Sequence, residues 1–310
     1  MSKHFREEDV AYEYTTFPRR FLGYKWFKPL LVAAAAAALT LLFQLIVSVA
    51  CAIWVGGMDQ LMQVADRSHE LFFKGPGVIL AVGGVAVMLP ALFLATCIVR
   101  DRPFSSYSSS RGGWNWVAFA KSLGVAVVVF GGLIVAQALL FPEAGADGVN
   151  RFNIIGLLAV LILVPIQATA EEYVFRGLLM QAIGSWTNLP VVAIVLSSIL
   201  FAVSHSYGVL GIVSVLCHGL GLAFITHHTK GLEASSAAHI ANNMSVFILS
   251  GFGLATTAEG GIVSLILTVV MMGLYCVAIV LLDTRFSWFT SQGDGTIEFN
   301  EKYRAKAKKQ

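Results

Sequence analysis

The sequence contains few charged residues for its length. Only 13% of its 310 residues are Asp, Glu, Lys or Arg, whereas 57% are hydrophobic. A soluble domain carries about 25% charged residues, so this chain has roughly half the usual share. This scarcity excludes a soluble two-domain enzyme, a disordered chain and a nucleic-acid-binding domain. The mean hydropathy of +0.75 indicates a polytopic membrane protein that lies within a lipid bilayer.

Cysteine is also scarce, and its spacing excludes two kinds of site. Cys51, Cys97, Cys217 and Cys276 lie far apart within apolar runs. Paired spacing of the kind found in disulfide frameworks or zinc sites is absent. We therefore expect four small, buried hydrophobic side chains. The His-Glu-x-x-His helix of zinc metalloproteases is absent as well.

Eight apolar runs follow one another along the chain. We expect each to be a helix, because a segment in lipid must satisfy its own backbone hydrogen bonds. The sequence thus predicts an all-α membrane helix bundle with about eight transmembrane helices. The first run is longer than a secretory h-region of about 7–15 residues, so we expect a retained span. The runs are residues 30–55, 77–99, 115–141, 153–182, 190–207, 209–227, 232–252 and 261–282.

Lys and Arg are distributed unequally between the two sets of connections. Sixteen lie on the tails and alternate loops, and only Arg67, Lys74 and Arg151 lie on the opposite loops. Because basic residues favour the cytoplasmic side, we expect a multi-pass plasma-membrane protein with both termini in the cytoplasm. The predicted units are an N-terminal tail (1–29), N-terminal transmembrane helices (30–110), a domain with the polar motifs (111–283) and a basic C-terminal tail (284–310).

Ionisable residues inside the apolar runs are rare, and each is a hypothesis for a functional site. Glu171, Glu172 and Arg176 interrupt the fourth run. Glu172 and Arg176 are four residues apart and can form an ion pair, which taken alone is typical of a structural contact. Glu171 is rotated by about 100° around the helix and need not share the arginine. It is therefore a candidate general base.

Two more polar pairs have the same helical spacing. Phe201 and His205 lie in the fifth run, and His239 and Asn243 lie in the seventh, with Asn242 turned aside. A single histidine is usually a hydrogen-bonded core residue, and His and Asn often link membrane helices. The same side chains can also hold a water or donate to an oxyanion. Together with Glu171, they form a plausible water-activating site.

The three motifs resemble those of a known family. Glu-Glu-x-x-x-Arg at 171–176, Phe-x-x-x-His at 201–205 and His-x-x-x-Asn at 239–243 match, in order, the motifs of the CPBP family. This family comprises the CAAX prenyl endopeptidases and the bacteriocin-processing, or Abi, intramembrane proteases. The resemblance covers roughly residues 115–252. It implies a helical endopeptidase that cleaves a peptide or membrane-anchored protein near the membrane surface.

The resemblance also implies roles for individual residues. Glu171 would activate a water molecule, assisted by His205. His239 and Asn243 would stabilise the tetrahedral oxyanion.

Glu172 and Arg176 would support these side chains. A metal-free glutamate mechanism without a cofactor is expected. A zinc ion held by Glu171, His205 and His239 is the alternative.

The position of His205 places a condition on this prediction. His205 lies about 22 Å along the fifth helix, whereas Glu171 and His239 fall in the cytoplasmic halves of their helices. We expect His205 to reach Glu171 only if its helix begins earlier, tilts or is interrupted near Ser204–Gly208. His218 matches no motif and is expected to be packed or hydrogen-bonded.

Two other classes of function are compatible with the sequence. A non-catalytic immunity or scaffold protein would bind a peptide in the same cavity, and the fold alone does not distinguish it from an enzyme. A transporter would use the carboxylates and histidines as a proton relay. No matching pair of broken helices or inverted repeat supports the transporter hypothesis.

Overall fold

The computed structural model describes residues 13–21, 23–65, 71–111, 113–142, 146–255 and 261–289. Within these residues the chain is helical and contains no β-strand, apart from one isolated bridge between Ser109 and Gly231. The predicted all-α bundle is thereby confirmed. The basic C-terminal tail from residue 290 and the first twelve residues lie outside the described part. The division into four units stays a prediction.

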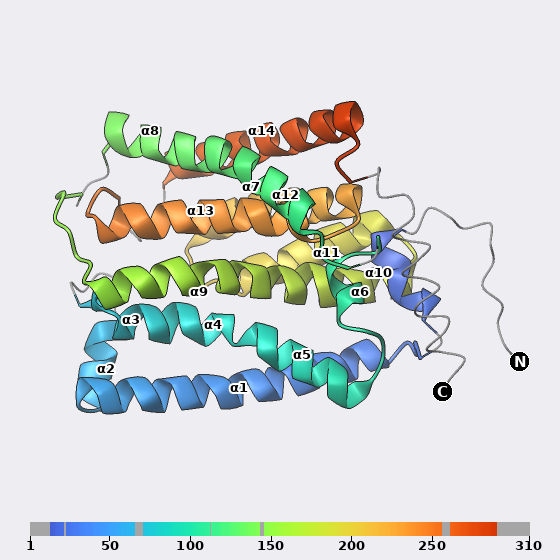
Figure 1. The fold of residues 1–310 in the computed structure, drawn as a ribbon, viewed down its shortest axis with the longest axis horizontal. Helices are drawn as coiled ribbons and strands as arrows, with labels where there is room; N and C mark the ends of the chain where they lie inside the picture. The colour runs from blue at the N-terminus through green and yellow to red at the C-terminus, as the bar shows by residue number, and fades with distance from the viewer. Residues whose placement is uncertain are drawn as a thin grey trace, which may run out of the picture.

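Helical segments follow one another along almost the whole described chain (Figure 1). Four short segments lie outside the long helical runs: η1 (Tyr14–Arg20), α2 (Met58–Ala65), η2 (Phe72–Lys74) and α6 (Ser105–Ser108). The remaining segments are α1 (Lys28–Val55), α3 (Pro76–Val78), η3 (Ile79–Gly83), α4 (Gly84–Ala86), α5 (Met88–Val99), α7 (Trp116–Ala126), η4 (Val127–Gly131), α8 (Gly132–Leu140), α9 (Ile154–Glu172), η5 (Tyr173–Met180), α10 (Gln181–Thr187), α11 (Pro190–Val203), α12 (Val209–Thr229), α13 (Glu233–Gly251) and α14 (Ile262–Phe286).

Six continuous segments of the described chain are long and apolar enough to cross a membrane. Each coincides with one of the eight predicted runs: Lys28–Val55, Pro76–Val99, Trp116–Leu140, Ile154–Thr187, Val209–Thr229 and Ile262–Phe286. The other two runs are also helices. However, α11 has only 14 residues, and α13 is less apolar because it carries the His-Asn motif. The count of eight crossings therefore stays a prediction.

The long helices form three layers in the view of Figure 1. One layer contains α1 and α5, the middle contains α9 and α13, and the opposite layer contains α7, α8 and α14. Only 11% of the most apolar stretch of α1 is buried inside the protein, whereas 44% of the corresponding stretch of Ile154–Thr187 is buried. Thus α1 lies at the edge of the bundle, while α9 lies in its centre with α13.

A close contact fixes the start of α9. The side chain of Asn153 accepts a hydrogen bond from the Gly156 amide and caps the helix. A Cβ atom on Gly156 would lie 1.7 Å from the carbonyl oxygen of Phe73. Only glycine allows this first turn to pack directly on η2, so the contact attaches α9 to the N-terminal layer.

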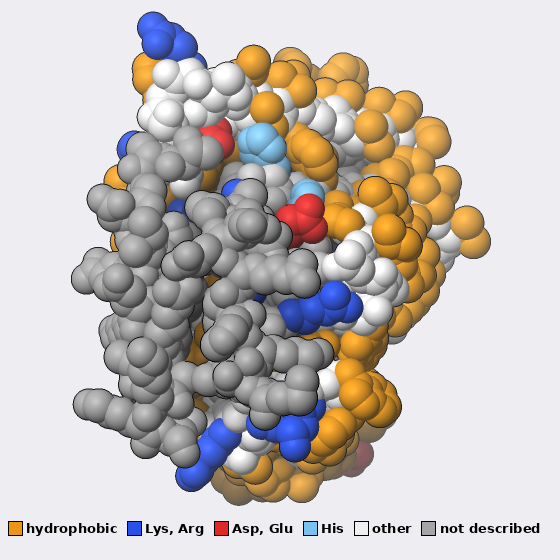
Figure 2. Space-filling view, turned by 90° about the vertical axis from the view of Figure 1, so that its right-hand side faces the viewer, with side chains coloured by type: hydrophobic (Ala, Val, Ile, Leu, Met, Phe, Trp, Pro, Cys, Tyr) orange, Lys and Arg blue, Asp and Glu red, His pale blue; other side chains and the backbone are white. Residues whose placement is uncertain are grey.

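The two ends of the bundle differ in charge. Helix η1 and the last turn of α14 lie at the same end (Figure 1). Lys28 is also at this end, where its Nζ donates to the carbonyl of Arg100 at 3.1 Å. Figure 2 looks onto this end, where Lys and Arg side chains are visible and hydrophobic ones cover the flanks. The asymmetry agrees with the predicted orientation, but the side of the membrane stays a prediction.

The four cysteines are free thiols, as expected. The expectation that all are buried is wrong. Only Cys51 is buried, while Cys97 is exposed on the outer surface of α5. In a membrane protein an apolar side chain faces lipid as readily as core, so burial does not follow from hydrophobicity.

Candidate active site

A cavity of about 830 Å³ lies between α9, α11, α12 and α13. The side chains of η3, α4, α5, η5 and α14 complete its walls. Most of the site residues predicted from the sequence meet in this one space. The polar side chains that line it are Gln167, Glu171, Ser204, His205, Ser206, Tyr207, Ser214, His218, His239, Asn242, Asn243 and Thr268.

The two adjacent glutamates occupy the last turn of α9. Glu171 lines the cavity, and Gln167 Nε2 donates to its Oε1 at 2.8 Å. Glu172 is fully buried, and Arg176 Nη1 donates to its Oε1 at 2.9 Å. The predicted i, i+4 ion pair is therefore confirmed. The π-helix η5 begins directly after Glu172, and such segments are frequent at functional sites.

Arg176 is fully buried, and three groups surround its guanidinium. Besides the ion pair, Nη2 donates to the carbonyl of Gly219 at 3.0 Å. The guanidinium carbon lies 4.5 Å from the ring centre of Phe201. A Cβ on Gly219 would approach the Phe201 ring to 3.0 Å, so glycine keeps α12 close to the arginine. The aromatic residue of the second motif thus covers the cation of the first.

His239 connects both glutamates. Its Nδ1 is 2.9 Å from Glu172 Oε1, and its Nε2 is 3.3 Å from Glu171 Oε2. Because an ionised carboxylate only accepts hydrogen bonds, Nδ1 must carry a proton that it donates to Glu172. On its other side the imidazole turns Nε2 toward Glu171 Oε2. Glu172 therefore does more than pair with Arg176, because it also orients the imidazole toward Glu171.

Of the three conditions that would bring His205 toward Glu171, the interruption near Ser204–Gly208 is present. Helix α11 ends at Val203, and Ser204–Gly208 form an irregular segment before α12. His205 lies in this segment and lines the same cavity as Glu171. Its Nδ1 is 2.8 Å from the Phe201 carbonyl oxygen. Since a carbonyl only accepts, Nδ1 carries the proton, and the lone pair of a neutral ring lies on Nε2.

Asn243 faces the cavity beside Gln167. Its Nδ2 donates to Gln167 Oε1 at 3.2 Å, which leaves a second N–H on the same nitrogen. Asn242 Nδ2 donates to Asn243 Oδ1 at 3.0 Å, and Asn242 also lines the cavity. The expectation that Asn242 is turned aside is wrong, because the cavity is wide enough to reach two faces of α13.

Sequence reasoning did not assign Gln167 or His218 to the site, although both line the cavity. Gln167 precedes Glu171 by one helical turn, and this i, i+4 spacing within an apolar run is a signal that was available. His218 was expected to be packed or hydrogen-bonded. It does pack, with its ring centre 5.6 Å from that of His239, but its buried Nε2 has no hydrogen-bond partner among the residues that the structure describes.

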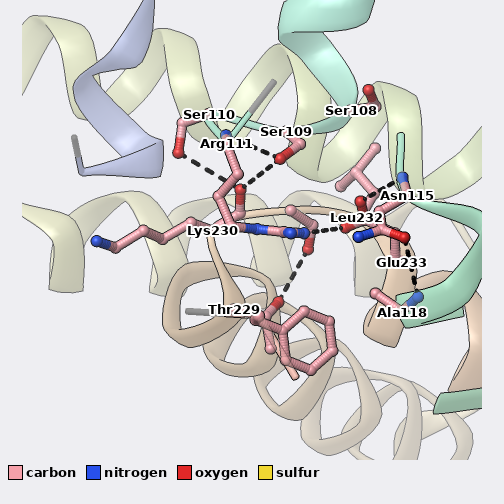
Figure 3. Close-up of polar contacts among 12 residues, drawn as sticks. Ser108, Ser109, Ser110, Arg111, Asn115, Ala118, Thr229, Lys230, Leu232 and Glu233 are labelled. Carbon is pink, nitrogen blue, oxygen red and sulfur yellow. Dashed lines mark hydrogen bonds and ion pairs between the residues drawn. The ribbon is translucent and has the colours of Figure 1, made fainter. Parts of the chain in front are cut away.

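A polar cluster at the N-terminal end of α13 holds this helix, which carries His239, in position (Figure 3). Glu233, in the first turn of α13, is fully buried. Arg111 Nη2 donates to its Oε2 at 2.7 Å, and the backbone amide of Asn115 donates to its Oε1 at 2.9 Å. The backbone amide of Leu232 donates to the Ser108 carbonyl at 2.8 Å. These contacts attach the start of α13 to the segment between α6 and α7.

The residues do not form a recognisable metal centre. Within the described ranges, no three His, Cys, Asp or Glu side chains are grouped closely enough to hold a metal ion. The alternative zinc set of Glu171, His205 and His239 is therefore not gathered as one group. Phe201 packs on both histidines, with ring-centre distances of 4.8 and 5.7 Å. Cleavage measured with and without a strong chelator tests directly whether the reaction requires a metal.

Residues 151–245 match the model of the family described as type II CAAX prenyl endopeptidase Rce1-like. Over this segment the chain is similar to that family. It runs from just before α9 into α13 and contains all three polar motifs. The resemblance predicted from the motifs is thus confirmed over this segment. The Rce1-like segment contributes most of the cavity, whereas η3, α4, α5, α14 and the part of α13 beyond residue 245 contribute walls from outside it.

One curated relative is also similar. The uncharacterized protein YyaK of Bacillus subtilis (strain 168) is 31% identical over 190 residues, which is 57% of this chain. The match covers 62% of that relative, less than two thirds of its length. No solved structure matches this chain significantly.

Proposed function

We propose that this protein is an intramembrane endopeptidase that hydrolyses a peptide bond with water activated by Glu171. One observation carries the proposal: the carboxylate of Glu171 lies 3.3 Å from His239 in a cavity that His205 and Asn243 also line. The Rce1-like match over the same residues supports it.

The geometry supports a simple sequence of proton transfers. A water in the cavity loses a proton to Glu171 Oε2, with the lone pair of His205 Nε2 as the second acceptor, and its oxygen bonds to the scissile carbonyl carbon. His239 Nε2 and the remaining N–H of Asn243 donate to the resulting oxyanion. The C–N bond then breaks, and Glu171 returns the proton to the leaving nitrogen.

Glu172 and Arg176 do not reach the substrate in this mechanism. They fix the imidazole of His239, in the way that a buried carboxylate orients a catalytic histidine elsewhere. The proposed substrate is a peptide or a membrane-anchored protein. The proposed location is the plasma membrane, with both termini in the cytoplasm, on the basis of the basic end of the bundle.

The first test is cleavage of a peptide library by detergent-purified protein. Replacing the general base by an amide, Glu171→Gln, is expected to lower kcat/KM by at least about 100-fold. The matched control is Thr169→Val, on the same helix, since the Thr169 hydroxyl donates only to the Pro165 carbonyl of its own helix. The control should cleave like the wild type, and each protein is assayed with and without a strong chelator.

The outcomes separate the competing functions. Unchanged cleavage by Glu171→Gln would overturn the mechanism. Loss of activity on chelation that zinc restores would give Glu171, His205 and His239 a role as ligands. A biological phenotype that persists in Glu171→Gln would support the non-catalytic immunity or scaffold module, and proton-coupled uptake into proteoliposomes would support a transporter.

A further inference from the structure

Four polar side chains form a connected cluster between α9 and α13. Each helix contributes two residues one turn apart: Gln167 and Glu171 from α9, and His239 and Asn243 from α13. Within α9, Gln167 Nε2 donates to Glu171 Oε1 at 2.8 Å. Between the helices, Asn243 Nδ2 donates to Gln167 Oε1 at 3.2 Å, and His239 Nε2 lies 3.3 Å from Glu171 Oε2. Within α13, His239 and Asn243 lie one helical turn apart on the same face.

The hydrogen bonds that run from Asn243 through Gln167 to Glu171 can have only one direction while Glu171 is ionised. A carboxylate accepts but does not donate, so Gln167 must turn its NH₂ group toward Glu171. Its carbonyl oxygen then faces α13 and can only accept, so Asn243 must turn its NH₂ group toward Gln167. The carbonyl of Asn243 consequently points to Asn242, whose Nδ2 donates to it at 3.0 Å. The charge on Glu171 thus sets the orientation of two amides.

We propose that Gln167 is a positioning residue that couples the ionised state of Glu171 to the orientation of the Asn243 amide. This inference rests on the proposed function. Gln167 donates to Oε1 of Glu171, whereas Oε2 faces His239 and accepts no hydrogen bond from the described residues, so Oε2 is the oxygen we assign to the water proton. It also keeps the N–H groups of Asn243 on the side of the cavity where the oxyanion forms.

Because these side chains are buried, the observed orientation of the Gln167 amide is strongly favoured over the reversed one. Gln167 is 8% exposed and Glu171 is 7% exposed. In such an environment a polar group without a partner is costly, whereas satisfied groups reinforce one another. Reversing the Gln167 amide would place its carbonyl oxygen against a carboxylate oxygen. The hydrogen bonds from Asn243 through Gln167 to Glu171 therefore have one stable direction, and Gln167 is the residue that joins the two helices.

The kinetic test uses Gln167→Leu, which has a similar volume but neither donor nor acceptor. We expect kcat to fall about 10- to 100-fold, because a hydrogen bond to a charged group is lost, while KM changes little. Thr169→Val is the matched control and should keep both constants. The double variant Gln167→Leu/Asn243→Leu should be no slower than the slower single variant, because both changes break one chain of contacts. Losses that multiply, or an unchanged kcat, would overturn the proposal.

A spectroscopic test requires no substrate. Protein labelled with ¹³C-glutamate is compared by infrared difference spectroscopy, and the carboxylate band lost in Glu171→Gln belongs to Glu171. This band should shift in Gln167→Leu and stay in place in Thr169→Val. A band that does not move would show that Gln167 leaves the carboxylate unaffected, which contradicts the proposal. Gln167→Met replaces the leucine variant if the latter does not elute as folded protein.

The two tests keep this inference apart from the proposed function. If Glu171→Gln is inactive while Gln167→Leu has wild-type kcat and an unshifted band, only the role of Gln167 is wrong. If Glu171→Gln cleaves like the wild type, the mechanism fails and the catalytic role of Gln167 falls with it, whatever the infrared band shows.

Discussion

Arg176 is the residue of the site whose burial has the highest desolvation cost. Its guanidinium is completely buried, and its charge is balanced by Glu172, which is also completely buried. A buried ion pair has a high desolvation cost, so its net contribution to stability is small. Removing one partner is different, because the remaining charge is left in a low-dielectric interior without compensation. The pair therefore makes the structure around His239 sensitive to changes in either residue.

Replacing Arg176 by leucine should lower the stability of the protein. Glu172 would keep His239 as a partner but lose its strongest one, and we expect a loss of about 3–5 kcal/mol in the free energy of unfolding. Unfolding in detergent by SDS titration measures this change. Arg285→Leu, which removes an exposed arginine near the end of α14, is the control and should change stability by less than about 0.5 kcal/mol. Equal stability of the two variants would show that the Glu172–Arg176 pair does not hold the site together.

At the scale of elements, the start of α13 determines where His239 lies. Arg111 and the Asn115 amide hold Glu233, and His239 follows six residues later, about 9 Å along the helix. Asn115 also caps α7, because its side chain accepts from the amides of Val117 and Ala118. One carboxylate therefore ties the beginnings of two helices to each other.

This tie predicts an unusual result for a double variant. Arg111→Met should reduce stability by about 3 kcal/mol, since it leaves Glu233 buried without its cation. Adding Glu233→Leu should restore part of the loss, because apolar residues often replace a buried ion pair without cost. The same SDS titration measures both variants. If the double variant is less stable than Arg111→Met, Glu233 contributes mainly through the Asn115 amide and not through the ion pair.

At the scale of the whole molecule, the basic end is also rich in exposed tryptophan. The exposed fractions of Trp26, Trp116 and Trp186 are 66%, 72% and 41%, and Trp186 Nε1 donates to the Trp26 carbonyl at 2.7 Å. Trp is enriched where a helix leaves the hydrocarbon region, so these residues mark a level at which the bundle meets the lipid headgroups. The basic side chains visible in Figure 2 lie at the same end.

Cysteine labelling in intact cells tests the orientation of the bundle. In a background with the four native cysteines replaced by alanine, Lys230→Cys should react only after the membrane is permeabilised. Val149→Cys, at the opposite end and 57% exposed, should react with an impermeant reagent added from outside. The reverse pattern would invert the topology, and labelling of both positions from one side would contradict the path of the helices.

The sequence by itself determined the features that depend on local spacing. Apolar runs of sufficient length predicted the helices, because backbone groups in lipid have no other partners. Four-residue spacing predicted the Glu172–Arg176 ion pair, since it depends only on the geometry of one helix. The same spacing placed His239 and Asn243 on one face. The order of the three motifs was enough to identify the Rce1-like segment.

Only the tertiary structure decided what these residues contact across helices. His239 bridges two glutamates 67 and 68 positions earlier in the chain, and Gln167 meets Asn243 across 76 positions. The end of α11 at Val203 brings His205 into the cavity, although its apolar run continues to residue 207. Such contacts depend on how α9, α11 and α13 pack against each other. Helix spacing fixes which face a side chain occupies, but packing fixes which partner that face meets.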